Sequence, residues 1–306
     1  EPVSVTSAGA PANGPSDDPA ISNDGRYVIF TSEALNLDGA TRGMMGKPYR
    51  GPGINVFLHD RQTGATMPVS VDNRGIAADG HAWLGDISAE GNYVTFSSHS
   101  DTLVTPDLNG IKRDPFIRDR VLQLTEFVDL LPNGKNPWSG GSFASVSANG
   151  WRVAYRSLAN NLVPGDTNSR FDIFVLDRGS HATRRVSLTS AGQQGTADAQ
   201  YPDISANGRF VAFDTASALV ASDGNARIDV YVHDMYTGQT ALASLSSAGL
   251  VADGLSEKAS ISDDGRYVSF VSAATNLVAD DTGGVTDIFV NDRQTGETAR
   301  VCMTDG

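Results

Sequence analysis

The sequence has one cysteine among its 306 residues, Cys302, so no disulfide can form within the chain. Disulfides are optional in exported bacterial proteins, so this count does not decide the compartment. No apolar run approaches the roughly 18 residues that a membrane-spanning helix needs. Positive charge is scarce as well, because 23 Lys and Arg stand against 36 Asp and Glu, giving a net charge of −13. An acidic chain of this kind is not expected to bind nucleic acid or insert into a membrane.

Several signals of common enzymes are also missing. The chain contains no Gly-x-Ser-x-Gly nucleophile turn, no Gly-x-Gly-x-x-Gly and no phosphate-binding loop. Its five histidines fall mostly at unrelated positions, so the spacing does not indicate the convergent ligands of a zinc site. No signal peptide is visible, and Glu1 is not a natural start, so we expect a processed or trimmed form. With its abundant Ser, Thr, Asn and Gly, the chain is predicted to be an extracytoplasmic bacterial protein, periplasmic or secreted.

What the sequence does contain is a block that recurs five times. Each block opens with Ser-x-(Asp/Glu/Asn)-Gly, first seen as Ser22-Asn23-Asp24-Gly25. The steps between successive turn glycines are 66, 59, 58 and 57 residues, obtained by subtraction from Gly25, Gly91, Gly150, Gly208 and Gly265. A period this long, made only of strand signals, indicates a radial or stacked array of small sheets.

Each block is predicted to form four short strands. After the glycine turn comes a strand in which a valine and an aromatic two residues later share one face, as in Val28 and Phe30. A third strand ends at an aspartate, and in three blocks Thr-Gly closes the following turn. This order predicts an all-β, five-bladed β-propeller of four-stranded antiparallel blades. The single domain, residues 1–306, divides into repeats at about 16–78, 82–136, 141–196, 199–252 and 256–303.

The repeats resemble a known family. The pattern Ser-x-Asp-Gly-Arg-Tyr-Val-x-Phe, then Asn-Leu-Val-x-x-Asp-Thr, then Asp-Ile-Phe-Val-x-Asp-Arg-x-Thr-Gly is similar to the TolB-like, WD-type propeller repeats of bacterial exported proteins. The resemblance covers essentially the whole chain. It implies a fold rather than an activity, because such propellers host many unrelated functions.

Closure of the ring is a separate question. Residues 2–9 repeat the fourth-strand sequence 185–192, so residues 1–9 are predicted to be a surplus outer strand. The simplest arrangement is a five-bladed ring in which residues 2–7 join or extend the last blade, beside or in place of 298–303. The alternative is a fragment of a longer propeller that lacks a blade. The insertion Ala40–Gly53 is interpreted as a lid, a partner loop or a disordered segment.

Topology places the variable loops together on one side of the disc. The hairpins between the first two and the last two strands are uniform, whereas the other connections vary, and variable loops on a rigid scaffold usually carry binding. The mouth of the channel on that side is therefore predicted to bind ligand. Aromatic residues with polar neighbours suit a sugar or another small polar ligand, although the aromatics could instead simply pack between blades. The predicted ligand-binding residues are Asp18, His81, Trp83, Asp86, Trp138, Tyr201, Asp203 and Lys258.

Three connections between the second and third strands share an acidic spacing that could hold structural Ca²⁺. Calcium prefers oxygen ligands from carboxylates, amides and carbonyls. The same residues also stabilise turns by bonding to their own backbone, so both interpretations stay open. A looser copy occurs at Asp107–Gly110, with Asp114. The predicted metal ligands are Asp166, Asn168, Asp172, Asp223, Asn225, Asp229, Asp281 and Asp287.

Three functions remain open from the sequence. The first is a non-enzymatic exported module that binds a glycan, peptide or protein partner on the variable face. The second is a hydrolase or lyase acting on a polysaccharide, with channel-mouth carboxylates such as Asp86 and Asp203 and with His81 in acid–base roles. The third is a scaffold subunit that assembles through its surplus terminal strand. No catalytic residue can be assigned from sequence, and the oligomeric state is not predicted.

Overall fold

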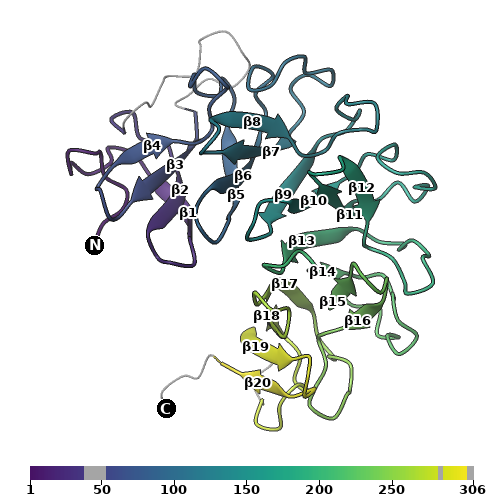
Figure 1. Cartoon of the computed structure of the whole chain (residues 1–306). Coiled ribbons are helices and arrows are strands. Elements are labelled where there is room, and N and C mark those ends of the chain that lie inside the picture. Colours follow the sequence, from purple (N-terminus) through teal and green to yellow (C-terminus); the bar gives the residue numbers. More distant parts are fainter. Residues whose placement is uncertain (38–52, 282–284, 302–306) are drawn as a thin grey trace.

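The computed structural model describes residues 1–37, 53–281 and 285–301. These residues form five four-stranded antiparallel sheets arranged as a five-bladed β-propeller, which confirms the predicted fold class (Figure 1). Within every sheet the strands are neighbours in sequence order. The insertion Ala40–Gly53, apart from Gly53, and the lone Cys302 lie outside the described residues.

The strand bounds repeat closely from blade to blade. They are β1 (Ser16–Ile21), β2 (Tyr27–Ser32), β3 (Asn55–Asp60) and β4 (Thr66–Pro68); β5 (Ala82–Ile87), β6 (Tyr93–Ser98), β7 (Asp114–Asp119) and β8 (Leu124–Phe127); β9 (Gly141–Val146), β10 (Arg152–Ser157), β11 (Asp172–Asp177) and β12 (Ala182–Arg185); β13 (Ala199–Ile204), β14 (Phe210–Thr215), β15 (Asp229–Asp234) and β16 (Thr240–Leu242); and β17 (Ser256–Ile261), β18 (Tyr267–Ser272), β19 (Asp287–Asp292) and β20 (Thr298–Arg300).

The recurring Ser-x-(Asp/Glu/Asn)-Gly motif is explained by its turn. In the first blade Ser22 Oγ accepts the N–H of Tyr27 at 3.0 Å and lies 2.6 Å from Asp24 Oδ1. Gly25 adopts a φ of 70°, a conformation that glycine tolerates better than residues with a Cβ. The motif is therefore a requirement of the hairpin between the first two strands.

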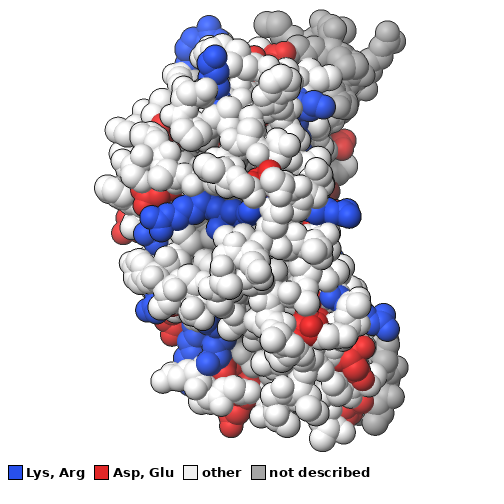
Figure 2. Space-filling model, turned by 90° about the vertical axis from the view of Figure 1, so that its right-hand side faces the viewer, with Lys and Arg blue, Asp and Glu red and all other residues white. Residues whose placement is uncertain are grey.

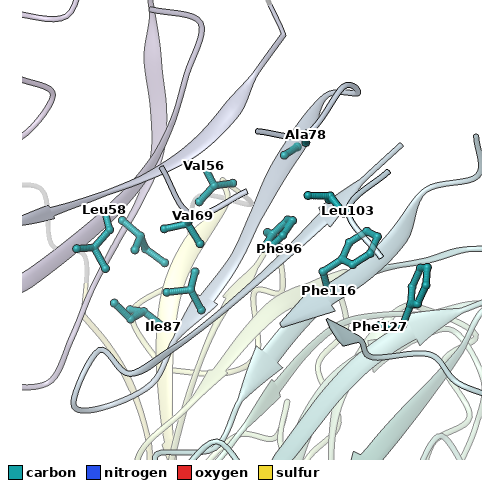
Figure 3. Close-up of a cluster of buried hydrophobic side chains, with 12 residues drawn as sticks. Val56, Leu58, Val69, Ala78, Ile87, Phe96, Leu103, Phe116 and Phe127 are labelled. Atoms are coloured by element: carbon teal, nitrogen blue, oxygen red, sulfur yellow. The ribbon is translucent and has the colours of Figure 1, made fainter. Parts of the chain in front are cut away.

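The predicted valine–aromatic face forms the packing between blades. In each blade the aromatic of the second strand stacks on that of the third, as Phe96 does on Phe116 at a centroid distance of 5.5 Å. The first blade contributes Val56, Leu58 and Val69 to the cluster around this pair (Figure 3). Because every blade buries one face on its neighbour, the blades hold the inner strands in fixed positions around the axis.

Strand register confirms that the variable connections share a side. Ser16 pairs with Ser32, which in turn pairs with Asn55. The connection that enters β1 and the connection from β2 to β3 therefore meet at one end of the blade. At the opposite end, Arg26 donates to both carboxylate oxygens of Asp60, at 3.0 and 2.7 Å. That guanidinium holds the pKa of Asp60 well below its usual range. Arg209–Asp234 and Arg266–Asp292 repeat the pair in the fourth and fifth blades.

The first and last blades are joined differently from the others. Extensive strand packing links each blade to the next at four junctions, and no comparable packing joins the described strands β17–β20 to β1–β4. Ile288 of the last blade is 44% exposed, whereas its counterparts Val56, Ile173 and Val230 are fully buried. A hydrogen bond of 2.7 Å from Asn23 Nδ2 to Asp263 Oδ2 connects the turns of the two blades.

The N-terminal segment does not complete the last blade. The backbone N–H of Thr66 donates to Ser7 Oγ at 2.9 Å, and Thr66 Oγ donates to the carbonyl of Val5 at 2.5 Å, so residues 5–7 lie along β4 of the first blade. Residues 188–190 contact Thr240 of the fourth blade in the same way. The segment predicted as a surplus outer strand of the last blade thus serves the first blade as an ordinary connection.

The third repeat, residues 141–196, carries six Arg against three Asp, so it is locally basic in a chain whose net charge is −13. Figure 2 shows a row of Lys and Arg atoms crossing the outer side of the molecule at the height of the third blade. The arginines of this blade are Arg152, Arg156, Arg170, Arg178, Arg184 and Arg185. An anionic ligand or partner would therefore meet a favourable field on this side of an otherwise acidic protein.

Candidate functional site

The inner strand of every blade is interrupted at the same place. The register between the first and second strands shifts in all five blades, for example between Asp17 and Ala20. In four blades the residue at the irregularity has a positive φ without being glycine: Asp18 (50°), Phe143 (51°), Tyr201 (47°) and Lys258 (55°). Such a conformation is uncommon for these residues, and bulges of this kind redirect side chains.

The redirected side chains line two adjoining cavities on the inner side of the blades. One has a volume of about 390 Å³, and Phe143, Tyr201, Asp203 and Lys258 are among its lining residues. The second, of about 450 Å³, is lined by Asp18, Pro19, Ala20, Trp83, Gly85, Arg113 and Phe143. Because Gly85 and Phe143 border both cavities, the two together can accommodate an extended ligand.

Arginine and aromatic side chains alternate along this site. The Arg113 guanidinium lies 4.5 Å from the centre of the Trp83 ring and 5.5 Å from that of Phe143. The Arg156 guanidinium lies 4.8 Å from the centre of the Phe143 ring and 4.2 Å from that of Phe171. Cation–π contacts of this kind hold a guanidinium in place while leaving its N–H groups free to donate. This row of arginine and aromatic side chains therefore presents guanidinium N–H donors and aromatic ring faces side by side.

Burial lowers the pKa of both arginines, and the charges of Asp198 and Asp214 act in the opposite direction on Arg156 without direct contact. Neither Arg113 nor Arg156 forms a salt bridge with a described residue; Arg156 donates to the Gln200 side-chain oxygen at 3.1 Å. The Nε atoms of both are buried without a hydrogen-bond partner among the described residues. Burial, together with the positive charge of Arg156, lowers the pKa of Arg113 to about 10, so the guanidinium is still charged at neutral pH. A bound carboxylate would supply the missing negative charge.

A second ladder of Asp and Ser forms the wall of the first cavity. Ser145 Oγ lies 3.0 Å from Asp86 Oδ2 and 2.9 Å from Asp203 Oδ1. The backbone N–H of Val146 donates to Asp86, and that of Ile261 donates to Asp203. Each side chain thus bridges its own blade to the next one.

The two carboxylates influence one another. Burial, and then the charge of Asp203, raises the pKa of Asp86 to about 6. One hydroxyl hydrogen cannot satisfy two carboxylates at once, so the Asp86–Ser145–Asp203 contacts favour a proton on one of the acids. Because their oxygens also accept N–H groups across the blade junctions, the geometry assigns both acids a structural role.

The structure brings most of the predicted ligand-binding residues together. Asp18, Trp83, Asp86, Tyr201, Asp203 and Lys258 line one or other cavity. The His81 ring lies tilted beside that of Trp83, with the ring centroids 5.8 Å apart, and His81 Nδ1 accepts the N–H of Ile54 at 3.2 Å. Trp138 lines neither cavity, and it is 86% exposed. Ligand binding by this set remains a prediction.

Sequence reasoning missed Arg113, Phe143 and Arg156. Phe143 could have been found by aligning the repeats, because it occupies the same bulge position as Asp18, Tyr201 and Lys258. Arg113 and Arg156 leave no such signal, since their counterparts in the first blade are Ile54 and Thr31. Their importance follows from which rings they contact, and no sequence spacing records those contacts.

The predicted calcium loops already contain internal partners. Arg185 Nη1 lies 3.0 Å from Asp166 and 3.2 Å from Asp172. Arg300 approaches Asp281 and Asp287 in the fifth blade. In the fourth blade Asn225 Nδ2 donates to Asp229 at 2.8 Å. Among the described residues, no three His, Cys, Asp or Glu side chains are gathered into a metal cage. Calcium at the eight predicted ligands therefore stays a prediction.

Comparison with known proteins defines the fold. No protein-family profile matches the chain, and no curated protein sequence matches it. Among solved structures, a TolB candidate from Agrobacterium tumefaciens is 15% identical with a TM-score of 0.54, over 94% of this chain and 80% of that one. TolB from Acinetobacter baumannii is 15% identical with a TM-score of 0.52, over 93% of this chain and 56% of that one. These similarities show a TolB-like propeller fold.

A third similar structure is an enzyme. Oligogalacturonate lyase in complex with manganese is 11% identical with a TM-score of 0.55, over 95% of this chain and 67% of that one. At this identity the likeness concerns the fold alone.

The described part of the chain contains no helix with the length and apolar character that crossing a bilayer requires.

Proposed function

We propose that this chain is an extracytoplasmic binding module of the TolB-like repeat type, which holds a carboxylate-bearing oligosaccharide at the mouth of its channel. The observation that supports this most directly is Arg113, which stacks on Trp83 and faces Phe143 without a carboxylate partner among the described residues. Aromatic faces suit sugar rings, and a guanidinium can donate two parallel hydrogen bonds to a carboxylate. A uronate ligand also agrees with the name of one protein of similar fold, oligogalacturonate lyase.

The ligand would be recognised in two parts. Trp83, Phe143 and Tyr201 offer ring faces across the adjoining cavities, and Phe143 and Tyr201 are 5.0 Å apart. Arg113, Arg156 and Lys258 supply positive charge beside those rings. A neutral oligosaccharide would use only the first part, so the site would discriminate against it. A protein partner would dock by presenting an acidic side chain to the same arginines, which makes acidic peptides the competing ligand class.

Replacement of Arg113 by Ala should weaken binding of uronate oligosaccharides at least tenfold, because a buried charge-assisted contact would be lost. Trp83→Ala should weaken both charged and neutral sugars. Isothermal titration with matched uronate and neutral oligosaccharides, and with acidic peptides, measures each affinity. Trp138→Ala is the control variant, since Trp138 lies outside both cavities.

The proposal would be abandoned if Arg113→Ala and Trp83→Ala bound uronates as tightly as the parent protein. Preference for acidic peptides over uronates would reassign the site to a protein partner. The same titrations test for turnover, because a lyase would produce unsaturated uronate that absorbs in the ultraviolet. Product formation that disappears in an Asp86 or Asp203 variant that still folds would favour the enzymatic alternative.

A further inference from the structure

The third and fourth blades satisfy the aspartate that opens their third strand in the same way. In the third blade Ser187 Oγ donates to Asp172 Oδ1 at 2.5 Å, and in the fourth Ser244 Oγ donates to Asp229 Oδ1 at 2.7 Å. The same serines accept a backbone N–H of the third strand, from Ile173 and Val230 respectively, both at 3.1 Å. The serine at this position therefore links the two strands and caps the acid.

In the third, fourth and fifth blades a guanidinium or a hydroxyl lies beside the remaining carboxylate oxygens, although Arg185 and Asp166 Oδ1 form an ion pair and not a hydrogen bond. Arg185 contacts Asp166 and Asp172 in the third blade, and Arg300, at the corresponding position, contacts Asp287 at 3.3 Å in the fifth. In the fourth blade, where Leu242 replaces the arginine, the hydroxyl of Tyr231 donates to Asp223. Each of these blades thus brings an internal donor to its loop aspartate, its strand aspartate or both.

The second blade lacks every one of these donors. Strand register aligns Asp129 with Ser187 and Ser244, and Phe127 with Arg185 and Arg300. Phe116 stands where Tyr231 supplies a hydroxyl, and Figure 3 shows Phe116 and Phe127 close together in the apolar cluster. Pro115 occupies the place of Ile173 and has no N–H to donate.

Buried oxygen atoms are left without partners as a result. Asp129 is fully buried, and neither of its carboxylate oxygens has a hydrogen-bond partner among the described residues. Asp114 is also fully buried, and its Oδ2 has no hydrogen-bond partner among the described residues. The same is true of Asn109 Oδ1 and Asp107 Oδ2. Leaving even one such buried polar group unsatisfied is costly, and a buried charge costs more.

The geometry directs these atoms toward one region. The N–H of Val128 donates to the carbonyl of Pro115 at 2.9 Å, so the next cross-strand position sets Asp129 beside Asp114. Asn109 Nδ2 donates to Asp114 Oδ1 at 2.8 Å, which places the Asn109 amide against the same carboxylate. Burial, and then the charge of Asp114, raises the pKa of Asp129 well above its usual range, as expected of neighbouring acids.

We propose that the second blade binds a calcium ion, held by the carboxylates of Asp129 and Asp114 and the side-chain oxygen of Asn109. Calcium takes six to eight oxygen ligands in flexible geometry, so carbonyls and water would complete the shell. This set contains two acids and one amide. It therefore agrees with the finding that no three His, Cys, Asp or Glu side chains are gathered into a metal cage among the described residues. Asp107, partly exposed on the loop before β7, would add negative charge near Asp129. The ion would supply the positive charge that Arg185 supplies in the third blade and Arg300 in the fifth.

Calcium titrated into the chelator-treated full chain should bind at about one ion per chain and raise its melting temperature by roughly 3–6 °C at saturation. Asp129→Asn removes the charge without changing the shape, and it should abolish both the binding heat and the thermal shift. Asp129→Ser, which introduces the residue of the third and fourth blades, should do the same. Isothermal titration calorimetry and differential scanning calorimetry are the two measurements.

Asp229→Asn is the matched control, because Asp229 opens the third strand of the fourth blade and Ser244 already satisfies it. This variant should retain the full calcium response. If neither heat nor a thermal shift accompanies calcium in the parent protein, Asp129 is simply a protonated acid and the proposal fails. It also fails if Asp129→Asn keeps the response, and a response lost in Asp229→Asn instead would assign the ion to the loops predicted from sequence.

Discussion

The protein should be several degrees more stable to heat at pH 5 than at pH 8. Burial raises the pKa of Asp214 to about 7 and that of Asp229 to about 6, and Asp86 is raised to about 6 in the central ladder. In the unfolded chain these acids titrate near 3.9. Between about pH 4 and pH 7 the folded state therefore binds more protons than the unfolded state. Stability contributed by these groups is present at low pH and is lost as the pH rises through this window.

Acids with the opposite shift set the lower limit. The arginine-paired Asp60, Asp234 and Asp292 have pKa values held below the usual range, so they stabilise the fold above about pH 4 and cease to do so below it. Maximum stability is therefore expected near pH 5. We expect the free energy of unfolding to fall by about 3–5 kcal/mol between pH 5 and pH 8, which corresponds to roughly 5–10 °C.

Scanning calorimetry at constant ionic strength measures this dependence. Asp214→Asn is the informative variant, because its amide oxygen can still accept the N–H of Lys258, which donates to Asp214 Oδ2 at 2.9 Å. The variant should lose a substantial part of the slope and be more stable than the parent at pH 8. A melting temperature that is constant from pH 5 to pH 8 would contradict the shifts assigned to these buried acids.

Gly140→Ala should be among the most destabilising single methyl additions in the chain. A Cβ built at Gly140 would lie 1.9 Å from the carbonyl oxygen of Arg113, which is backbone and cannot rotate away. The connection entering β9 and the start of β7 would have to separate. We expect a loss of about 3 kcal/mol or more in the free energy of unfolding, seen as a fall of roughly 6 °C in melting temperature.

The same change should impair ligand binding, since it displaces the residue that carries the guanidinium. Gly224→Ala is the matched control: no heavy atom lies within 4 Å of the Cβ position at Gly224, so its melting temperature should change little. Equal stability of the two variants would show that the approach of residue 140 to residue 113 is not a tight constraint in solution.

Much of the fold could be read from the sequence because local rules decide it. The serine–glycine turn, the valine–aromatic pair and the aspartate closing the third strand each specify a strand end or a buried face, and the period multiplies the signal fivefold. The uniform and variable faces follow from the antiparallel order alone. The N-terminal segment was misplaced because its likeness to residues 185–192 does not say which blade it contacts; Thr66 decides that.

The site was only partly predictable for a related reason. Asp18, Tyr201 and Lys258 occupy a repeat position, so alignment alone brings them to the axis. Arg113 and Arg156 have no equivalent in the other blades, and their role depends on rings contributed by neighbouring sheets. The unsatisfied state of Asp129 could not be inferred from its own residue type. It depends also on Pro115, on Phe127 in place of an arginine, and on Phe116, which has no hydroxyl such as that of Tyr231, and these residues become related only in the folded blade.

The bulge of the inner strands has an evolutionary consequence. Its backbone is shared while its side chain ranges from an acid to an amine to aromatic rings, so the scaffold treats that position as a socket. A descendant could exchange these few side chains and acquire a new ligand specificity while every sheet keeps its backbone.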